Sequence, residues 1–272
     1  TTGSDISGDG SINSPFRSIQ YALNVVNEYD SIHVASGTYN PVDQIIWPPD
    51  KSNITLLGEN KSNTIISGSD THRIFLIDSG QSNITIENFT LTNGLGNDGL
   101  GGVGGGLGGA LYVSGIDNLN INNVDFTDNN ALGYGLDTGG GAIYMYFSEV
   151  EIWGSTFANN YVHVHGGAIY MPSSTLSLTR CLFYGNISGS GSQGCIFAIK
   201  AYTGAPSCNL TIDHSTFNSA NVWWDILIDG NSFYPTHSVS VTNSILYNTN
   251  IAATSGNYND LGFSYNNDNN PW

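Results

Sequence analysis

The chain has 272 residues, of which 10 % are charged, and its formal net charge is −16. A chain this acidic is repelled by nucleic acid and by anionic lipid surfaces, so neither is expected as a partner. Its apolar runs all fall short of the ~18 residues of a membrane-spanning helix, so no membrane-embedded segment is expected. A cation, a neutral glycan or a basic protein surface remains open as a partner.

The chain begins with a polar turn that has the residue types of a calcium loop. Asp5, Ser7 and Asp9 offer oxygen ligands at alternate positions, and Gly10 follows them. This is the start of a calcium-loop spacing, although no Glu stands at the twelfth position, so the loop is not an EF-hand. The turn therefore either binds calcium through these three residues or is a polar lead into the next element.

Residues 15–28 carry the one good helical pattern. Apolar residues recur at helical spacing and would form one face, at Phe16, Ile19, Ala22, Leu23 and Val26. Ser14 before Pro15 suits a helix cap followed by Pro at the first helical position. We expect this helix to lie over the first coil and to shield an exposed sheet edge.

Beyond the helix, one short pattern recurs along the chain. An apolar pair at i and i+2 is followed five residues later by a bulky apolar residue, and often by an Asn. The bulky residues are 26 to 35 positions apart, at Leu91, Phe126, Phe157, Phe183, Phe217 and Leu246. Period-2 alternation predicts short strands with the pair pointing inward. One such coil cannot bury its apolar side alone, so the coils must stack, with the recurring Asn residues forming a ladder along the stack.

A second series of strands precedes each of these, with the sequence Gly-Gly-Ala-Leu/Ile-Tyr at 108–112, 140–144 and 166–170. Strand parity places its apolar pairs inward and an aromatic row outward, at Tyr112, Tyr144, Tyr170 and Phe197. Rings spaced along a β stack could hold sugar rings or the apolar side chains of a partner. The alternative is that insertions at 94–107 and 130–140 fold over the row and pack on it.

Three smaller features each allow two interpretations. His163 and His165, at i and i+2, could bind zinc or could belong to a polar turn. Trp223 and Trp224 could stack on a ligand or plug the core. Six Asn-x-Ser/Thr sequons favour an extracellular location, and three cysteines are too few for a disulfide framework.

Several segments resemble known β-helix families. Residues 10–22, 30–34 and 37–39 resemble the opening of pectate-lyase-like β-helix proteins. The Gly-Gly-Ala-Ile and Phe-x-x-Asn repeats resemble the polymorphic outer membrane protein repeat of chlamydiae. These repeats and the ending at 266–272 also resemble adhesin-like surface proteins of methanogenic archaea. The resemblance covers nearly the whole chain and implies a parallel β-helix at the cell surface.

The same resemblance implies one possible enzymatic activity, that of a polysaccharide lyase. Pectate-lyase-like enzymes use a Lys or Arg to take the proton α to a uronate carboxyl, with calcium or another cation to neutralise that carboxylate. Candidates are Arg180, which strand parity places outward, and Lys200, with Asp213 and His214 nearby. The alternative is scattered solubilising charge. A hydrolase would need two facing carboxylates about 5–10 Å apart, and no repeated acidic pair marks such a site.

The sequence thus predicts an all-β protein, a single-stranded right-handed parallel β-helix with a short N-terminal capping helix. We expect one domain over 1–272, with the cap and first coil at 1–40, stacked coils at 41–250 and a tail at 251–272, as a fragment of a larger surface protein. The predicted function is an extracellular, non-catalytic, adhesin-like module that binds glycan or protein on another cell. The alternative is a lyase or hydrolase acting on an acidic polysaccharide.

Overall fold

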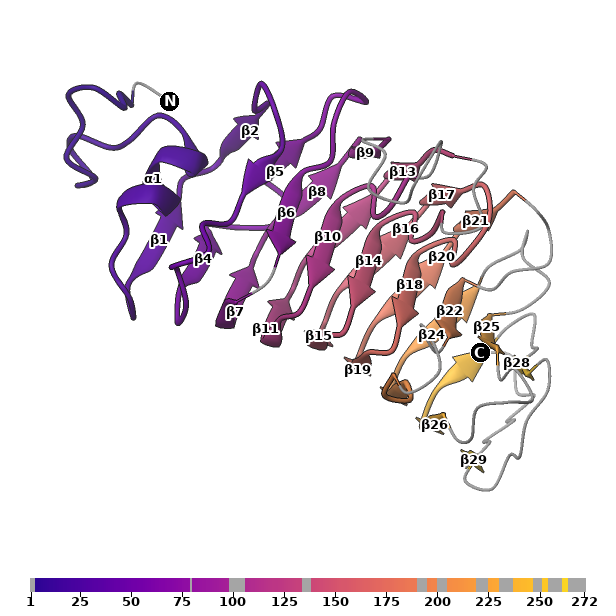
Figure 1. Ribbon diagram of the computed structural model, residues 1–272. Helices are drawn as coiled ribbons and strands as arrows, with labels where there is room; N and C mark the ends of the chain where they lie inside the picture. Colours follow the sequence, from indigo (N-terminus) through magenta and orange to yellow (C-terminus); the bar gives the residue numbers. More distant parts are fainter. Residues whose placement is uncertain are drawn as a thin grey trace.

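The computed structural model describes residues 3–78, 80–97, 106–133, 138–189, 195–199, 205–218, 225–229, 237–246, 251–253 and 261–263. Over these residues the chain winds into a right-handed parallel β-helix with one short helix at its N-terminal end (Figure 1). Successive coils follow one another along the stack in chain order. The fold class predicted from the repeat is confirmed.

Each full coil passes through four parallel sheets, numbered I to IV in the order in which the chain meets them. Sheet I contains β1 (Ser31–Val34), β4 (Thr55–Gly58), β7 (Ser82–Glu87), β11 (Asp117–Asn122), β15 (Glu149–Trp153), β19 (Thr175–Thr179), β23 (Asn209–Asp213), β26 (Ser238–Thr242) and β29 (Leu261–Phe263). Sheet II contains β2 (Gly37–Tyr39), β5 (Thr64–Ser67), β8 (Thr90–Thr92), β12 (Asp125–Thr127), β16 (Thr156–Ala158), β20 (Leu182–Tyr184), β24 (Thr216–Asn218) and β27 (Ile245–Leu246). The short sheet III contains β9 (Leu95–Gly96), β13 (Asn130–Ala131), β17 (Tyr161–Val162) and β21 (Ile187–Ser188). Sheet IV contains β3 (Ile45–Ile46), β6 (Phe75–Asp78), β10 (Leu111–Ser114), β14 (Ile143–Tyr146), β18 (Ile169–Pro172), β22 (Ile196–Ile199), β25 (Ile226–Asp229) and β28 (Ile251–Ala253).

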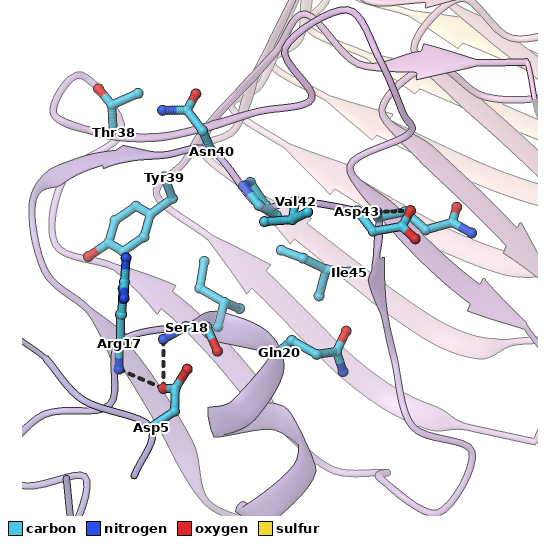
Figure 2. Close-up of a pocket in the computed structure, with 13 residues that line it drawn as sticks. Asp5, Arg17, Ser18, Gln20, Thr38, Tyr39, Asn40, Val42, Asp43 and Ile45 are labelled. Atoms are coloured by element: carbon cyan, nitrogen blue, oxygen red, sulfur yellow. Dashed lines mark hydrogen bonds between the residues drawn. The ribbon is translucent and has the colours of Figure 1, made fainter. Parts of the chain in front are cut away.

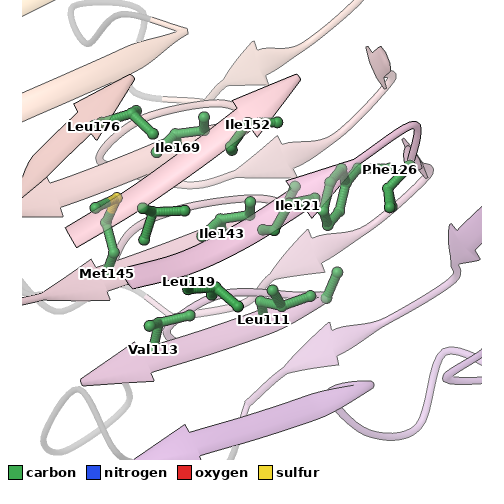
Figure 3. Packing of buried hydrophobic residues seen from close by; sticks show 14 of the residues in the cluster. Leu111, Val113, Leu119, Ile121, Phe126, Ile143, Met145, Ile152, Ile169 and Leu176 are labelled. Carbon is green, nitrogen blue, oxygen red and sulfur yellow. The ribbon is translucent and has the colours of Figure 1, made fainter. Parts of the chain in front are cut away.

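The inward-facing pairs of sheets I and IV form one continuous core. Leu111 and Val113 of β10 point toward Leu119 and Ile121 of β11, and all four are fully buried (Figure 3). A fully buried aliphatic side chain of this size contributes about 1.5–3 kcal/mol. The same alternation recurs in the coils whose side chains the structure describes, so the strand parity predicted from the sequence is confirmed.

The bulky residue of each coil forms a stack on the sheet II side of the core. Phe126 stacks on Phe157 at 4.7 Å between ring centroids, and Phe157 stacks on Phe183 at 4.6 Å. Phe217 continues the stack at 4.4 Å. These distances match the ~4.8 Å spacing of adjacent strands, so each ring lies directly on the ring of the neighbouring coil.

The first two glycines of the Gly-Gly-Ala segment have different roles. Gly140 has a φ of +71°, in the left-handed region where a side chain would be strained. A Cβ on Gly141 would collide with the carbonyl oxygen of Gly167 in the next coil. The repeated pair therefore lets the chain turn sharply and approach its neighbour closely.

The capping helix α1 (Ile19–Val25) is shorter than the sequence pattern predicted. Its N-cap is Ser18, whose side chain accepts from the N–H of Tyr21, so the predicted start at Ser14 and Pro15 is wrong. The carbonyl of Pro15 accepts from the N–H of Ser4, and the carboxylate of Asp5 accepts from the N–H of Ser18. These bonds hold residues 15–18 against the N-terminal turn and outside the helix.

No helix in the described part of the chain is long and apolar enough to cross a membrane. The three cysteines are all buried and unbridged, at Cys181, Cys195 and Cys208. Burial raises the pKa of the Cys181 thiol to about 11, so it stays protonated. The three thiols therefore act as small core side chains.

Candidate ligand-binding site

The aromatic row lies on the outer face of sheet IV, as predicted, but most of it is covered. Tyr144, Tyr170 and Phe197 are 8 %, 6 % and 2 % exposed. They form a second apolar cluster with Leu107 and Leu227, separate from the main core. A ring with so little exposed surface has no face left for a sugar. The packing alternative is thus the one that these three residues favour.

The cover is a strip of backbone that joins three coils. Leu107, Gly139 and His165 pair with one another as parallel bridges across the row. The His165 ring stacks on Phe197 at 4.6 Å with 9° between the planes, and a Cβ on Gly139 would collide with the Tyr170 ring. His165 therefore packs on the row. In the described ranges, no three His, Cys, Asp or Glu side chains are grouped to hold a metal ion.

Tyr112 is the half-buried end of the row. It stacks on Tyr144 at 5.2 Å, and the guanidinium carbon of Arg73 lies 5.3 Å from its ring centroid. Arg73 is itself buried and donates to the carbonyl oxygens of Leu107 and Gly108. The guanidinium of Arg73 thus holds the backbone strip that covers the row, and it does not face solvent.

The three residues of the predicted calcium turn each have a different partner. Asp5 accepts from the backbone N–H groups of Arg17 and Ser18 at 2.8 and 2.9 Å (Figure 2). Ser7 hydrogen-bonds Ser4, and the carboxylate of Asp9 accepts from the N–H of Ser11. Burial works against ionisation of Asp5, but the hydrogen bonds from Ser18 and Arg17 prevail and lower its pKa. Calcium binding by this turn stays a prediction.

Three predicted site residues, Lys200, Trp223 and Trp224, lie outside the described residues. The other three lyase candidates, Arg180, Asp213 and His214, lie together at the corner between sheets I and II. The backbone N–H of Arg180 donates to the carbonyl of Asp213 at 3.0 Å, so the two are on adjacent coils. We call this region the corner site and define it by Trp153, Arg180, Asp213 and His214.

The corner has left-handed backbone in each of the six coils that begin with β7, β11, β15, β19, β23 and β26. The residues with positive φ there are Asn88, Asn123, Gly154, Arg180, His214 and Asn243. Asn and Gly tolerate this conformation, whereas Arg180, at a φ of 56°, adopts it against the usual preference of a long side chain. Such an exception is a reason to look for function at the corner.

Trp153 brings an aromatic surface to the corner. It is the last residue of β15, it faces outward, and it is 48 % exposed. The guanidinium carbon of Arg180, on the next coil, lies 5.8 Å from the Trp153 ring centroid, within range of a cation–π contact. The pair forms a broad, half-exposed surface with one positive charge.

Asp213 and His214 extend the corner by one coil. The Asp213 carboxylate accepts from Thr242 Oγ1 at 2.7 Å, His214 Nδ1 at 2.7 Å and Asn243 Nδ2 at 2.9 Å. These hydrogen bonds, that from Thr242 first, hold the pKa of Asp213 well below its usual range, so it stays ionised. Because the Asp213 carboxylate only accepts, Nδ1 of His214 must be the donor of their hydrogen bond. In the neutral ring this leaves Nε2 as an acceptor.

These observations define the class of the protein as a right-handed parallel β-helix with a polar lateral corner. A family model described as a protein of unknown function, DUF1565, matches residues 1–133. The model of the Chlamydia polymorphic membrane protein repeat matches residues 154–172, which begin at the corner. A search of curated proteins returned no match.

Solved structures support the same class. A pectin methylesterase from Yersinia enterocolitica superposes with a TM-score of 0.54 at 14 % identity, over 88 % of this chain and 82 % of its own. A pectin methylesterase from carrot gives a TM-score of 0.53 at 11 % identity, over 90 % of this chain and 86 % of its own. At such low identity these likenesses show the fold alone, a parallel β-helix.

Proposed function

We propose that this chain is an extracellular, adhesin-like β-helix module that binds a glycan at the corner site without catalysing a reaction. The observation that carries the proposal is the half-exposed Trp153 ring with the Arg180 guanidinium 5.8 Å away. A flat aromatic face beside a hydrogen-bond donor suits a sugar ring, which has an apolar face and polar edges.

The outer face of sheet I supports a glycan that extends along the stack. A column of short polar side chains runs past the corner site, at Thr85, Asn120, Glu151, Ser177 and Thr211. Adjacent members are ~4.8 Å apart, so they offer regularly spaced donors and acceptors. Coils stacked in this way give a long, rigid lateral surface.

The surface location is supported by the comparisons and by the sequence. The Chlamydia polymorphic membrane protein repeat and the resemblance to archaeal adhesin-like proteins both favour a place outside the cell. The two pectin methylesterases act, by their names, on a polysaccharide, which favours a glycan over a protein as the ligand.

One observation favours a second function, that of a carbohydrate-active enzyme. The Asp213–His214 hydrogen bond at 2.7 Å orients an imidazole on the coil adjacent to Arg180, as acid–base chemistry on an acidic polysaccharide would require. In a lyase Arg180 would take the proton α to the uronate carboxyl, and a cation bound to that carboxylate would neutralise it.

A glycan array followed by calorimetric titration of any hit tests the proposal. Trp153→Ala should weaken binding at least tenfold, because loss of a central aromatic contact costs about 1.4 kcal/mol or more. Leu132→Ala removes another exposed apolar side chain, away from the corner, and should leave affinity unchanged. Equal affinity of the Trp153 variant and the wild type would overturn the proposal.

Incubation of the hit with the protein separates the two functions. Intact glycan after prolonged incubation, also with added calcium, agrees with a binding module. Unsaturated sugars that absorb in the ultraviolet, or shortened chains, would establish the enzyme, and loss of that activity in His214→Gln would locate it at the corner.

A further inference from the structure

A cleft in the N-terminal cap lies far along the stack from the corner site. It opens between α1 and the segment of residues 38–45, with a volume of about 710 Å³ (Figure 2). That volume is within the usual range of small-molecule sites, roughly 300–1,000 Å³. The cleft lies between α1 and the first coil, outside the recurring sequence pattern. Neither the repeat nor the aromatic row therefore predicts it.

The walls of the cleft are held in place by hydrogen bonds. The Gln20 side chain accepts from the N–H of Ile46 at 2.7 Å and donates to its carbonyl at 2.8 Å, so the helix is fastened to the edge strand β3. On the opposite wall, the Tyr39 hydroxyl donates to the carbonyl of Ala35, and a ring nitrogen of His72 contacts the carbonyl of Pro41. The cleft is therefore formed before any ligand binds.

The charges of the lining disfavour an anion. The lining includes two carboxylates, Asp5 and Asp43, and one guanidinium, that of Arg17 (Figure 2). Burial, with a further contribution from Glu59, raises the pKa of Tyr39, so its hydroxyl stays neutral. In a chain with a net charge of −16, this site repels acidic sugars.

The remaining lining matches a ligand rich in hydroxyl groups. Thr38 and Asn40 provide both donors and acceptors, and Gln44 provides amide donors while its oxygen accepts from Arg73 at 3.0 Å. Asp43 is an exposed carboxylate, one oxygen of which accepts from the N–H of Gln44. Tyr39 contributes a half-buried aromatic ring. Val42, at the rim, is fully exposed and would gain apolar contact from an occupant.

From this arrangement we propose that the cap cleft binds a neutral, hydroxyl-rich ligand, such as a short uncharged oligosaccharide. The site is independent of the corner site, since it uses other residues at the other end of the described stack. The two sites also differ in charge, because the corner site has one guanidinium and one carboxylate, Arg180 and Asp213, whereas the cleft has two carboxylates and one guanidinium.

Calorimetric titration of the full chain tests the cleft, in the Trp153→Ala background so that the corner does not contribute. The probes are cellohexaose, mannohexaose and galactohexaose, with hexagalacturonate as the acidic comparison. We expect at least one neutral probe to bind and hexagalacturonate to bind at least tenfold more weakly. Failure of every neutral probe at millimolar concentration, or preference for the acidic one, would overturn the proposal.

Two variants place the binding in the cleft. Asp43→Ala removes an exposed acceptor and should weaken binding at least fivefold, whereas Asp117→Ala removes an exposed carboxylate on sheet I and should not. Val42→Trp should block the mouth without touching the bonds of the cap. Affinity unchanged by both cleft variants would place the binding elsewhere and refute the assignment. Neither result bears on the Trp153 test of the proposed function.

Discussion

The side-chain amide of Asn160 donates to the side-chain oxygen of Asn186 at 2.9 Å, in a layer where both residues are fully buried. Asn129 makes the same contact with Asn160 one coil earlier, at 3.1 Å. Each Asn also donates to a backbone carbonyl, as Asn160 does to Phe126 at 3.0 Å. The predicted Asn ladder is therefore present and closes the turn between sheets II and III.

Replacing the middle member of the ladder should destabilise the fold strongly. Asn160→Ala removes the partners of the buried backbone N–H of Asn129, of one amide hydrogen of Asn129 and of the carbonyl of Phe126, and each unsatisfied group costs about 1–3 kcal/mol. We expect the free energy of unfolding to fall by about 3 kcal/mol or more in urea titrations, since three groups lose their partners. Asn209→Ala, at an exposed residue with one side-chain contact of 3.3 Å, is the control and should change little. An equal decrease in the free energy of unfolding in both variants would show that the ladder does not stabilise the fold more than an exposed Asn does.

At the corner, Arg180→Gly should weaken glycan binding without lowering the stability of the fold. Glycine adopts a φ of 56° without strain, and a left-handed L-residue costs about 1–2 kcal/mol. We therefore expect the variant to be at least as stable as the wild type in thermal unfolding. Glycan affinity should nevertheless fall, because the guanidinium over Trp153 is gone. A variant that is clearly less stable would show that Arg180 holds the corner together instead.

The repeat explains why so much of the fold was predictable. Apolar pairs such as Leu111 and Val113 recur with a fixed period, and a one-residue shift would turn each pair outward. The same parity places Trp153 outward, one residue beyond the inward Ile152, so the key residue of the corner site was predictable from the pattern. The repeat pattern alone, however, does not distinguish Trp153 from the other outward-facing residues.

The cover over the aromatic row and the cap cleft were not predictable in the same way. Parity gives the side of the sheet on which Tyr170 lies, but the bridge between Gly139 and His165 that buries it is a tertiary contact between turns. The shortened α1 is also a tertiary effect, since Asp5 binds the backbone of Arg17 and Ser18. Local periodicity carries no information about either contact.

The repeat pattern also did not predict the burial of the Asp225 carboxyl. Asp225 occupies the place of Ala168 and Cys195 in the preceding coils and is 2 % exposed. Neither carboxylate oxygen has a hydrogen-bond partner within the described ranges. Burial raises its pKa from 3.8 to about 6, so a charge there is disfavoured in the folded chain.

This carboxyl should make the protein more stable at mildly acidic pH. Between pH 3.8 and about 6 the folded state keeps a proton that the unfolded state has lost, so stability falls as pH rises through that window and is level above it. A shift of this size corresponds to roughly 2–3 kcal/mol. Asp225→Asn should abolish the difference in stability between pH 4.5 and pH 7.5 and should stabilise the chain at the higher value. An unaltered pH profile in that variant would show that Asp225 is not the group responsible. Asp213, with its lowered pKa, acts in the opposite sense and only below pH 3.8.

The covered aromatic row should contribute to stability through the packing of Tyr170. Tyr170 contacts Tyr144 at 5.5 Å and Phe197 at 5.4 Å, and little of its ring reaches solvent. Tyr170→Ala should therefore leave a cavity and lower the free energy of unfolding by about 3–5 kcal/mol, the usual cost for a large buried ring. Tyr170→Phe keeps the ring and serves as the matched control, with a much smaller loss. If the row instead bound a ligand in an open state, Tyr170→Ala would abolish binding while the melting temperature hardly moved. Thermal unfolding and titration of the same two variants decide between a packed row and a ligand platform.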